Sequence, residues 1–315
     1  MHPAYSVIFF TTLSGAGYGL LICISALVLL EAIPIDPIFS IVTLGPALVL
    51  IVTGLLSSTL HLGRPTRAWR ALSQWRTSWL SREGVLSIAT FFPAGFFAVV
   101  WFMQSSYWGL PAIAAGLSII LALATVYCTG MIYQSLPTVR AWHLPIVSPI
   151  YCVLALATGA LIANLILRFA AIDLPAFTIL TTALLCLAAI MKSAYWVAID
   201  RAPRTYSAGA ATGLANLGEV RPLDPPHTQP NFVMREMGYE IGRKHAGKLR
   251  AIALFAGFIL PALLLIATLF VPPMIAMPIT AVAIFICAIG VFVERWLFFA
   301  EAQHVVTLYY GAQTA

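Results

Sequence analysis

The sequence predicts an all-α integral membrane protein, a bundle of eight transmembrane helices, and three observations lead to this prediction. Apolar residues make up 61% of the 315 residues and charged residues only 9%, whereas soluble domains carry about 25% charged residues. No charged residue lies between Glu83 and Arg140 or between Arg250 and Glu294, and a span needs about 20 apolar residues, so each stretch crosses a bilayer twice. The apolar runs lack period-two alternation, which selects helices rather than a closed barrel.

The eight spans together are expected to form one membrane domain that covers residues 1–315. They lie at about 7–30, 38–60, 84–104, 111–134, 147–168, 174–199, 251–271 and 275–297. The first run has no basic segment and no small-residue cleavage site, so we interpret it as a retained span. Most prolines fall in connections, but Pro93 and Pro261 fall inside spans, where neighbouring helices must satisfy the freed carbonyls. The sequence leaves open whether the helices divide into two halves of four.

The basic residues predict how the bundle lies in the membrane. All but one of the 17 Lys and Arg residues fall on one side of an eight-span arrangement, mainly in the connection 61–83 and in a polar loop at about 200–250. Arg140, Lys192 and Arg295 belong to the same side, and only Arg168 falls on the other. Because basic loops stay in the cytoplasm, we expect an inner (cytoplasmic) membrane protein with both termini cytoplasmic.

Composition also argues against several functions. The net charge of +6 does not indicate nucleic-acid binding, because the basic residues serve as the topology signal and face an anionic leaflet. The five cysteines fall inside predicted spans and form no C-x-x-C pair, so we expect no zinc or iron–sulfur site in this chain. We interpret them as packing residues; they are Cys23, Cys128, Cys152, Cys186 and Cys287.

One histidine and one carboxylate flank the arginine-rich connection and suggest quinone chemistry. His61 lies at its start and Glu83 at its end, each at the expected boundary between water and lipid. Adjacent helices would bring the two ends together. A quinone cycle moves two protons with two electrons, and it needs a hydrogen-bond donor and a route for protons to water. An imidazole with a pKa of about 6.5 and a partly buried carboxylate meet both needs.

Six segments of the chain are recognisable as family motifs. They are His61–Pro65, Arg67–Trp69, Ser78–Glu83, Asn231–Gly238, Glu294–Ala302 and His304–Gly311. These segments resemble the dimethyl sulfoxide (DMSO) reductase anchor subunits, the DmsC family, and the resemblance covers essentially the whole chain.

The resemblance implies a membrane anchor that exchanges electrons with quinone, either ubiquinone or menaquinone. The expected partners are a four-cluster iron–sulfur subunit and a molybdopterin catalytic subunit, so this chain itself would hold no molybdenum. The resemblance assigns the quinone site to His61 and Glu83. Because the docking face is expected to be cytoplasmic, the chain is most similar to the branch that serves cytoplasmic sulfite dehydrogenases, which deliver electrons from sulfite to quinone. The alternative is that the chain anchors an oxidoreductase complex that acts on another sulfur compound.

Other side chains near the same face are candidates for the quinone headgroup. They are Arg64, Trp79, Lys192 and His304. Lys192 lies inside a span, and intramembrane charges are functional hypotheses by default. We favour the interpretation that its ammonium reaches the interface along a flexible stem, and a place beside the quinone is the second interpretation.

Two further functions stay open at this point. A haem b subunit needs two axial ligands, and the candidates are His61, His143 and His304 near the cytoplasmic face. A secondary transporter should show broken spans with ionisable residues at mid-membrane. Pro93 and Pro261 interrupt spans, but no charge lies beside either, so transport is the least favoured function.

Overall fold

The computed structural model describes residues 1–60, 62–103, 106–202, 206–221, 223–224, 228–229, 231–237, 239 and 241–314. Within these residues, eight helices are long and apolar enough to span a membrane, which confirms the predicted fold class. Six of the spans are single α-helices that precede the long polar loop: α1 (Tyr5–Leu29), α2 (Pro37–Thr59), α3 (Trp79–Met103), α4 (Leu110–Gln134), α5 (Val147–Phe169) and α6 (Pro175–Arg201). The seventh span runs through α10 (Ala246–Leu254), η3 (Phe255–Ile259), α11 (Leu260–Ala267) and η4 (Thr268–Phe270), and the eighth is α12 (Pro273–Ala300).

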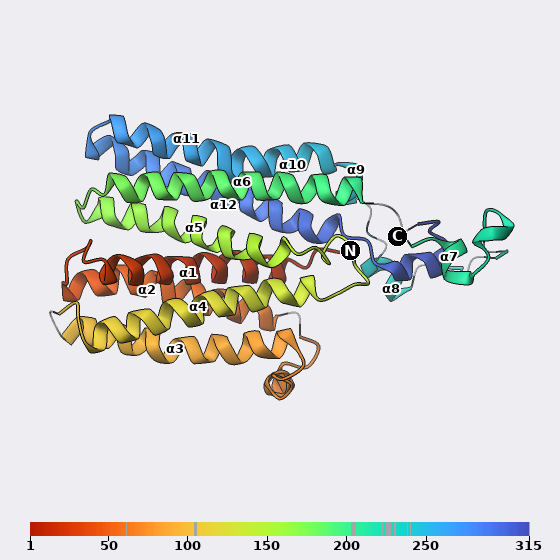
Figure 1. Ribbon diagram of the computed structural model, residues 1–315, viewed down its shortest axis with the longest axis horizontal. Helices are drawn as coiled ribbons and strands as arrows, with labels where there is room; N and C mark the ends of the chain where they lie inside the picture. The colour runs from red at the N-terminus through yellow and green to blue at the C-terminus, as the bar shows by residue number, and fades with distance from the viewer. Residues whose placement is uncertain are drawn as a thin grey trace.

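Short elements lie outside the spans. The arginine-rich connection contains the 3-10 helix η1 (Pro65–Leu72). The polar loop and the tail contain α7 (Ala208–Thr212), η2 (Ala215–Leu217), α8 (Phe232–Met237), α9 (Ile241–Lys244) and η5 (Val305–Tyr310). These elements project from the end of the bundle where both termini lie (Figure 1). We call it the termini end.

Pro261 explains the irregular seventh span. A proline has no N–H, so it cannot bond the carbonyl four residues before it, and its ring crowds that carbonyl. The chain accommodates this by a π-helical turn, η3, directly before Pro261. The freed carbonyl of Gly257 accepts a hydrogen bond from the Cys287 thiol of α12 at 3.2 Å. A neighbouring helix thus satisfies the group that proline releases, as expected for a proline inside a span.

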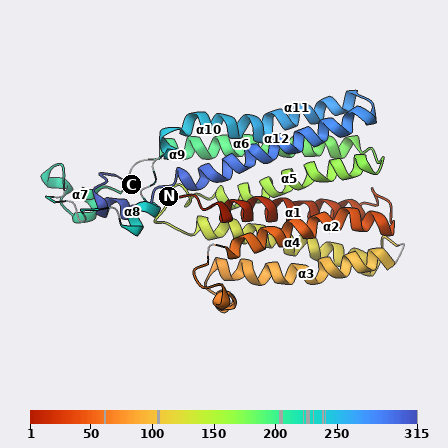
Figure 2. The same ribbon diagram turned by 180° about the vertical axis from the view of Figure 1, so that it is seen from behind.

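The eight spans form two groups of four. Helices α1–α4 lie together, and α5, α6, the α10–α11 span and α12 form the second group (Figures 1 and 2). The groups meet where α1 crosses α5. A Cβ on Gly19 would lie 1.8 Å from the Ala155 carbonyl oxygen, and one on Gly159 would lie 2.1 Å from the Gly19 carbonyl carbon. The two backbones touch because small residues allow close approach of membrane helices.

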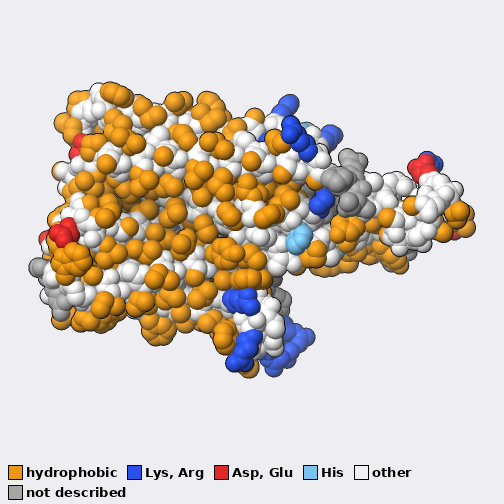
Figure 3. All heavy atoms as spheres, in the orientation of Figure 1, with side chains coloured by type: hydrophobic (Ala, Val, Ile, Leu, Met, Phe, Trp, Pro, Cys, Tyr) orange, Lys and Arg blue, Asp and Glu red, His pale blue; other side chains and the backbone are white. Residues whose placement is uncertain are grey.

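The surface of the bundle suits a bilayer. Apolar side chains cover the length of the helices, whereas Lys and Arg side chains collect around the termini end (Figure 3). The Met1 amino group donates a hydrogen bond to the Ala302 carbonyl oxygen at 2.7 Å, which places the beginning of the chain against the segment that follows α12.

The α1–α5 crossing can be tested with two glycine substitutions. Gly19→Ala should destabilise the bundle strongly, because the added methyl group would overlap the α5 backbone. Gly45→Ala is the control, since a Cβ at Gly45 meets no atom of the described residues within 4 Å. Thermal unfolding in detergent measures the difference, and equal midpoints for the two variants would contradict the packing described here.

Candidate functional site: a polar layer inside the bundle

Ionisable side chains gather inside the bundle at one level near the termini end. Glu83 lies in the second turn of α3, Lys192 in α6, and Glu294 with Arg295 in α12. All four are buried, with exposed fractions of 5%, 1%, 0% and 2%. Each lies within about three turns of the end of its helix. We call this set the polar layer. A charged side chain inside the membrane costs several kcal/mol unless it is paired. The role of each of these side chains therefore depends on the groups that it bonds.

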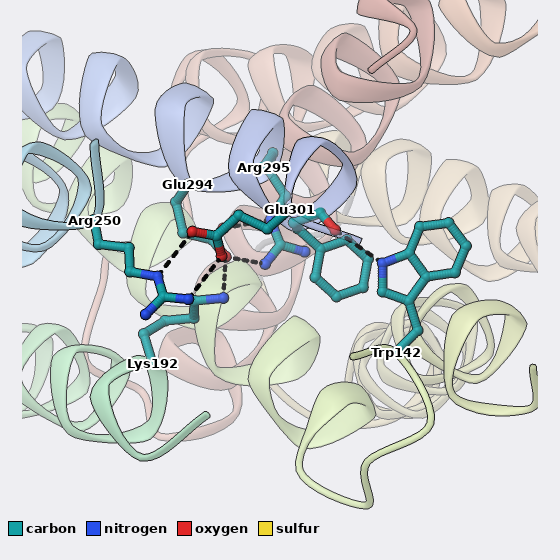
Figure 4. A network of polar contacts seen from close by, with 7 residues as sticks. Trp142, Lys192, Arg250, Glu294, Arg295 and Glu301 are labelled. Carbon is teal, nitrogen blue, oxygen red and sulfur yellow. Dashed lines mark hydrogen bonds and ion pairs between the residues drawn. The ribbon is translucent and has the colours of Figure 1, made fainter. Parts of the chain in front are cut away.

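Glu294 is the centre of a buried ion cluster (Figure 4). Its Oε1 lies 2.6 Å from Lys192 Nζ. Arg295 Nη2 donates to the same oxygen at 2.6 Å, and Arg295 Nε donates to Oε2. Two cations and one anion therefore share a buried site. The cluster of Lys192, Glu294 and Arg295, here called the Glu294 cluster, carries a formal charge of +1.

Aromatic rings surround the excess positive charge. Lys192 Nζ lies 4.0 Å from the ring centroid of Tyr195 and 5.0 Å from that of Trp196. The Arg295 guanidinium lies 4.3 Å from the Tyr151 ring centroid. The negative faces of such rings attract cations, and the attraction is strongest where water is excluded. The rings thus offset part of the cost of burying two cations beside one carboxylate.

Arg250 forms two further ion pairs beside the cluster (Figure 4). Arg250 Nε donates to Glu301 Oε1 at 2.8 Å, and Arg250 Nη1 donates to Asp200 Oδ2 at 2.6 Å. Burial raises the pKa of the Glu301 carboxyl, and the hydrogen bond and charge of Arg250 oppose that rise. A cavity of about 520 Å³ opens beside these groups, and its lining includes Arg140, Asp200, Arg250 and Glu301. We call it the outer cavity.

Glu83 stands apart from this cluster, in the other group of helices. Its carboxylate accepts a hydrogen bond from the Thr129 hydroxyl of α4. The arginine-rich connection folds over the start of α3, because the Ser81 hydroxyl bonds the Ala71 carbonyl oxygen and a Cβ on Gly84 would lie 2.7 Å from Leu72. Glu83 is therefore covered on the side where η1 packs.

The structure corrects the expected position of Glu83. Helix α3 begins at Trp79 rather than at residue 84, because the Ser78 hydroxyl accepts a hydrogen bond from the Ser81 N–H at 3.4 Å and starts the helix earlier. Glu83 consequently lies in the second turn of α3, and its side chain is buried among the helices. His61, its expected partner, lies outside the described residues.

The interfacial interpretation of Lys192 is wrong. Its ammonium group is buried and bonded to Glu294, and the Asp200 carboxylate that lies near it in the sequence bonds Arg250 instead. Arg295, which the charge count assigned to the cytoplasmic face, is buried as well. The sequence contained two signals for this cluster: Lys192 lies inside a predicted span, and the adjacent Glu294 and Arg295 directly follow an uncharged run within the predicted span 275–297.

The remaining candidates lie at the termini end but not in the polar layer. Arg64 is exposed on the connection before η1. Trp79 is half-buried, and the Arg82 guanidinium lies 4.2 Å from its ring centroid. His143 is exposed, with Nδ1 2.7 Å from the Gln134 carbonyl oxygen. His304 is half-buried, and its Nδ1 accepts from the Val306 N–H at 3.0 Å.

These histidines do not suit a haem inside the bundle. Axial ligation of haem b is simplest with two histidines on facing helices. In the part of the chain that the structure describes, no transmembrane helix carries a histidine within its bounds. Burial lowers the pKa of His304.

The charge balance of the Glu294 cluster makes a specific prediction about stability. Glu294→Gln leaves two buried cations without an anion, so it should destabilise the protein by about 3–5 kcal/mol. Lys192→Met leaves the neutral Glu294–Arg295 pair and should cost less. Adding Lys192→Met to Glu294→Gln should restore part of the lost stability. Thermal unfolding in detergent measures the order, with the exposed Glu219→Gln as a neutral control, and a reversed order of the two single variants would contradict the charge count.

Comparisons with known proteins agree with this architecture. The family model of the DMSO reductase anchor subunit (DmsC) matches residues 1–311. The chain is also 32% identical over 330 aligned residues to a subunit of the sulfite dehydrogenase of Allochromatium vinosum, and the match covers 98% of this chain and 99% of that protein. Eight membrane-spanning helices and a match over nearly the whole length lead to one conclusion: the chain belongs to the DMSO reductase anchor subunit family.

Proposed function

We propose that this chain is the quinone-reactive anchor of a membrane-bound oxidoreductase complex. The observation that carries the proposal is the buried Glu83 carboxyl group, which Thr129 bonds at the termini end. It is an ionisable group at the end of the bundle from which the polar loop and the tail project (Figure 1). Quinone reduction needs a proton donor held away from bulk water, and a positioned carboxyl group can supply one.

Glu83 would act on a quinone that enters from the lipid. Two electrons arrive from the partner subunit, and two protons are added to the two carbonyl oxygens of the quinone, which leaves as quinol. Glu83 would donate a proton to one of these oxygens and then be reprotonated from water, and His61 would pass the second proton to the other oxygen. The Thr129 hydroxyl fixes the orientation of the carboxyl group. His61 is the proposed hydrogen-bond partner on the other side, with Arg64 and Trp79 nearby in the sequence.

The electrons for quinone reduction would come from partner subunits. We propose that a four-cluster iron–sulfur subunit docks on the termini end and that a molybdopterin subunit holds the catalytic centre. The likeness to the sulfite dehydrogenase subunit supports sulfite as the reductant and quinone as the acceptor. The chemistry of the polar layer suits ubiquinone and menaquinone equally, because both present two carbonyl oxygens.

The concentration of basic residues at the termini end supports a cytoplasmic orientation of that end in the inner membrane. A reporter fused after Ala315 tests the orientation. The account predicts that a reporter active only in the cytoplasm works in this fusion and that a reporter active only in the periplasm does not. The opposite pattern would place the docking face outside the cell and remove the argument for a cytoplasmic sulfite dehydrogenase.

Glu83→Gln tests the catalytic proposal. The amide keeps the size of the side chain but cannot deliver a proton, so quinone turnover by the intact complex should fall by about 10²-fold or more. Glu31→Gln is the matched control, because Glu31 lies at the opposite end of the bundle and bonds only the Trp108 indole among the described residues. Unchanged turnover in an assembled Glu83→Gln complex would exclude Glu83 as the proton donor.

A further inference from the structure

A narrow cavity lies between Glu83 and the Glu294 cluster. It is lined by α1, α4, α5 and α12, and its volume of about 20 Å³ is enough for one water molecule. Its lining includes Thr129, which bonds Glu83, and Arg295, which bonds Glu294. We call it the inner cavity. It is the space between the two ionisable parts of the polar layer.

Three buried hydroxyl groups in the lining point to a ligand that forms hydrogen bonds. They belong to Thr12, Tyr18 and Tyr151, and none of the three makes a hydrogen bond of good geometry to any residue that the structure describes. Ser87 is near enough to Tyr18, and Arg295 to Tyr151, for a weak bond only. Tyr18 is 2% exposed and Tyr151 is 5% exposed. A buried hydroxyl without a partner costs about 1–3 kcal/mol, and buried polar groups in proteins are nearly always satisfied by protein or ordered water. One water in the inner cavity would satisfy several of them together.

The inner cavity has an ionisable neighbour on each side. Thr129, which bonds Glu83, lines the cavity together with Tyr18 and Tyr151. On the other side, the Arg295 guanidinium lies over the Tyr151 ring and bonds Glu294. Lys192 and Arg250 both lie over the Trp196 ring, 5.0 Å and 5.7 Å from its centroid, and Arg250 bonds Glu301 at the outer cavity. Ionisable groups and hydroxyls thus follow one another from the outer cavity to Glu83.

We propose that the inner cavity binds a water molecule that completes a proton route from the outer cavity to Glu83. The proposal rests on the quinone function proposed above and names the groups that reprotonate Glu83. A proton enters at Glu301, passes by way of Lys192 to the Glu294 carboxylate, and crosses the Tyr151 hydroxyl and the cavity water to the Glu83 carboxylate. Arg295 keeps its proton throughout, since a guanidinium does not deprotonate in proteins.

The protons that enter at the outer cavity equal those that Glu83 gives to the quinone. Each proton that Glu83 gives to a quinone oxygen is replaced by one taken from the outer cavity, and the two electrons come from the iron–sulfur subunit. The Glu294 cluster returns to its starting charge after each transfer.

Two isosteric substitutions test the route in the intact complex. Tyr18→Phe and Tyr151→Phe each remove a hydroxyl from the inner cavity without changing Glu83 or Glu294. We expect each to lower quinone turnover roughly five- to tenfold and to increase the solvent deuterium isotope effect, because proton delivery becomes slower than chemistry. The affinity for a quinone analogue should stay at the wild-type value, since neither hydroxyl is proposed to touch the quinone.

Thr158→Val is the matched control. Thr158 also lines the inner cavity, but its hydroxyl already donates to the Leu154 carbonyl oxygen of its own helix at 2.8 Å. This variant should keep wild-type turnover and isotope effect. Wild-type values of both quantities in the two Tyr→Phe variants would overturn the route.

Glu83→Gln separates failure of the route from failure of the function. Slow turnover in Glu83→Gln with wild-type behaviour in both Tyr→Phe variants would remove the route and leave the quinone function standing. Fast turnover in Glu83→Gln would remove the function itself. A high-resolution structure of the wild-type complex gives a test that needs no variant: density for a water between Tyr18, Thr129 and Tyr151 supports the proposal, and a dry cavity overturns it.

Discussion

Pairing of buried charge is the constraint on which the inner part of this bundle depends. Lys192, Glu294 and Arg295 lie in a region that lipid surrounds, where each unpaired ion costs several kcal/mol. The contact between Lys192 and Glu294 joins α6 to α12, and the Arg295 side chain extends from the same carboxylate toward α5. Three helices of the second group are thereby held in one register at the termini end. Apolar residues of similar volume often stabilise a protein as much as a buried ion pair does, so the presence of these charges inside the bundle is a reason to look for function there.

The two groups of helices divide the chemistry between them. Glu83 and Thr129 belong to α3 and α4, whereas the Glu294 cluster belongs to α6 and α12. The crossing of α1 and α5 at Gly19 and Gly159 brings the groups into backbone contact. The inner cavity lies between these parts, and its lining draws on both groups. The glycine contact therefore determines more than packing, because it fixes the spacing across which a proton would pass.

Much of the fold follows from the sequence, and the reasons are physical. Lipid requires every backbone group to be satisfied within its own segment, so uncharged runs such as 84–139 define spans with little ambiguity. Pro261 was placed inside a span from the same pattern. The π-helical turn and the bond from Cys287 to Gly257 depend on a tertiary neighbour, which a one-dimensional pattern does not contain.

Less of the candidate site than of the fold could be predicted from the sequence. Glu83 was identified through its motif, yet its depth depended on where α3 begins, and the hydroxyl of Ser78 moved that point toward the connection. Lys192 was noticed as an intramembrane charge, but its partner lies 102 positions away in α12. An ion pair between two helices can be predicted only when it is known which helices are neighbours. Thr129, Tyr18 and Tyr151 gave no signal, because a single hydroxyl in an apolar span is ordinary.

The most direct test of the central claim is a structure of the assembled complex with a quinone analogue bound. The account predicts that the analogue lies at the termini end, with a carbonyl oxygen within hydrogen-bond distance of Glu83 and with η1 covering the site. A headgroup bound at the opposite end of the bundle, beside Arg168, would contradict it.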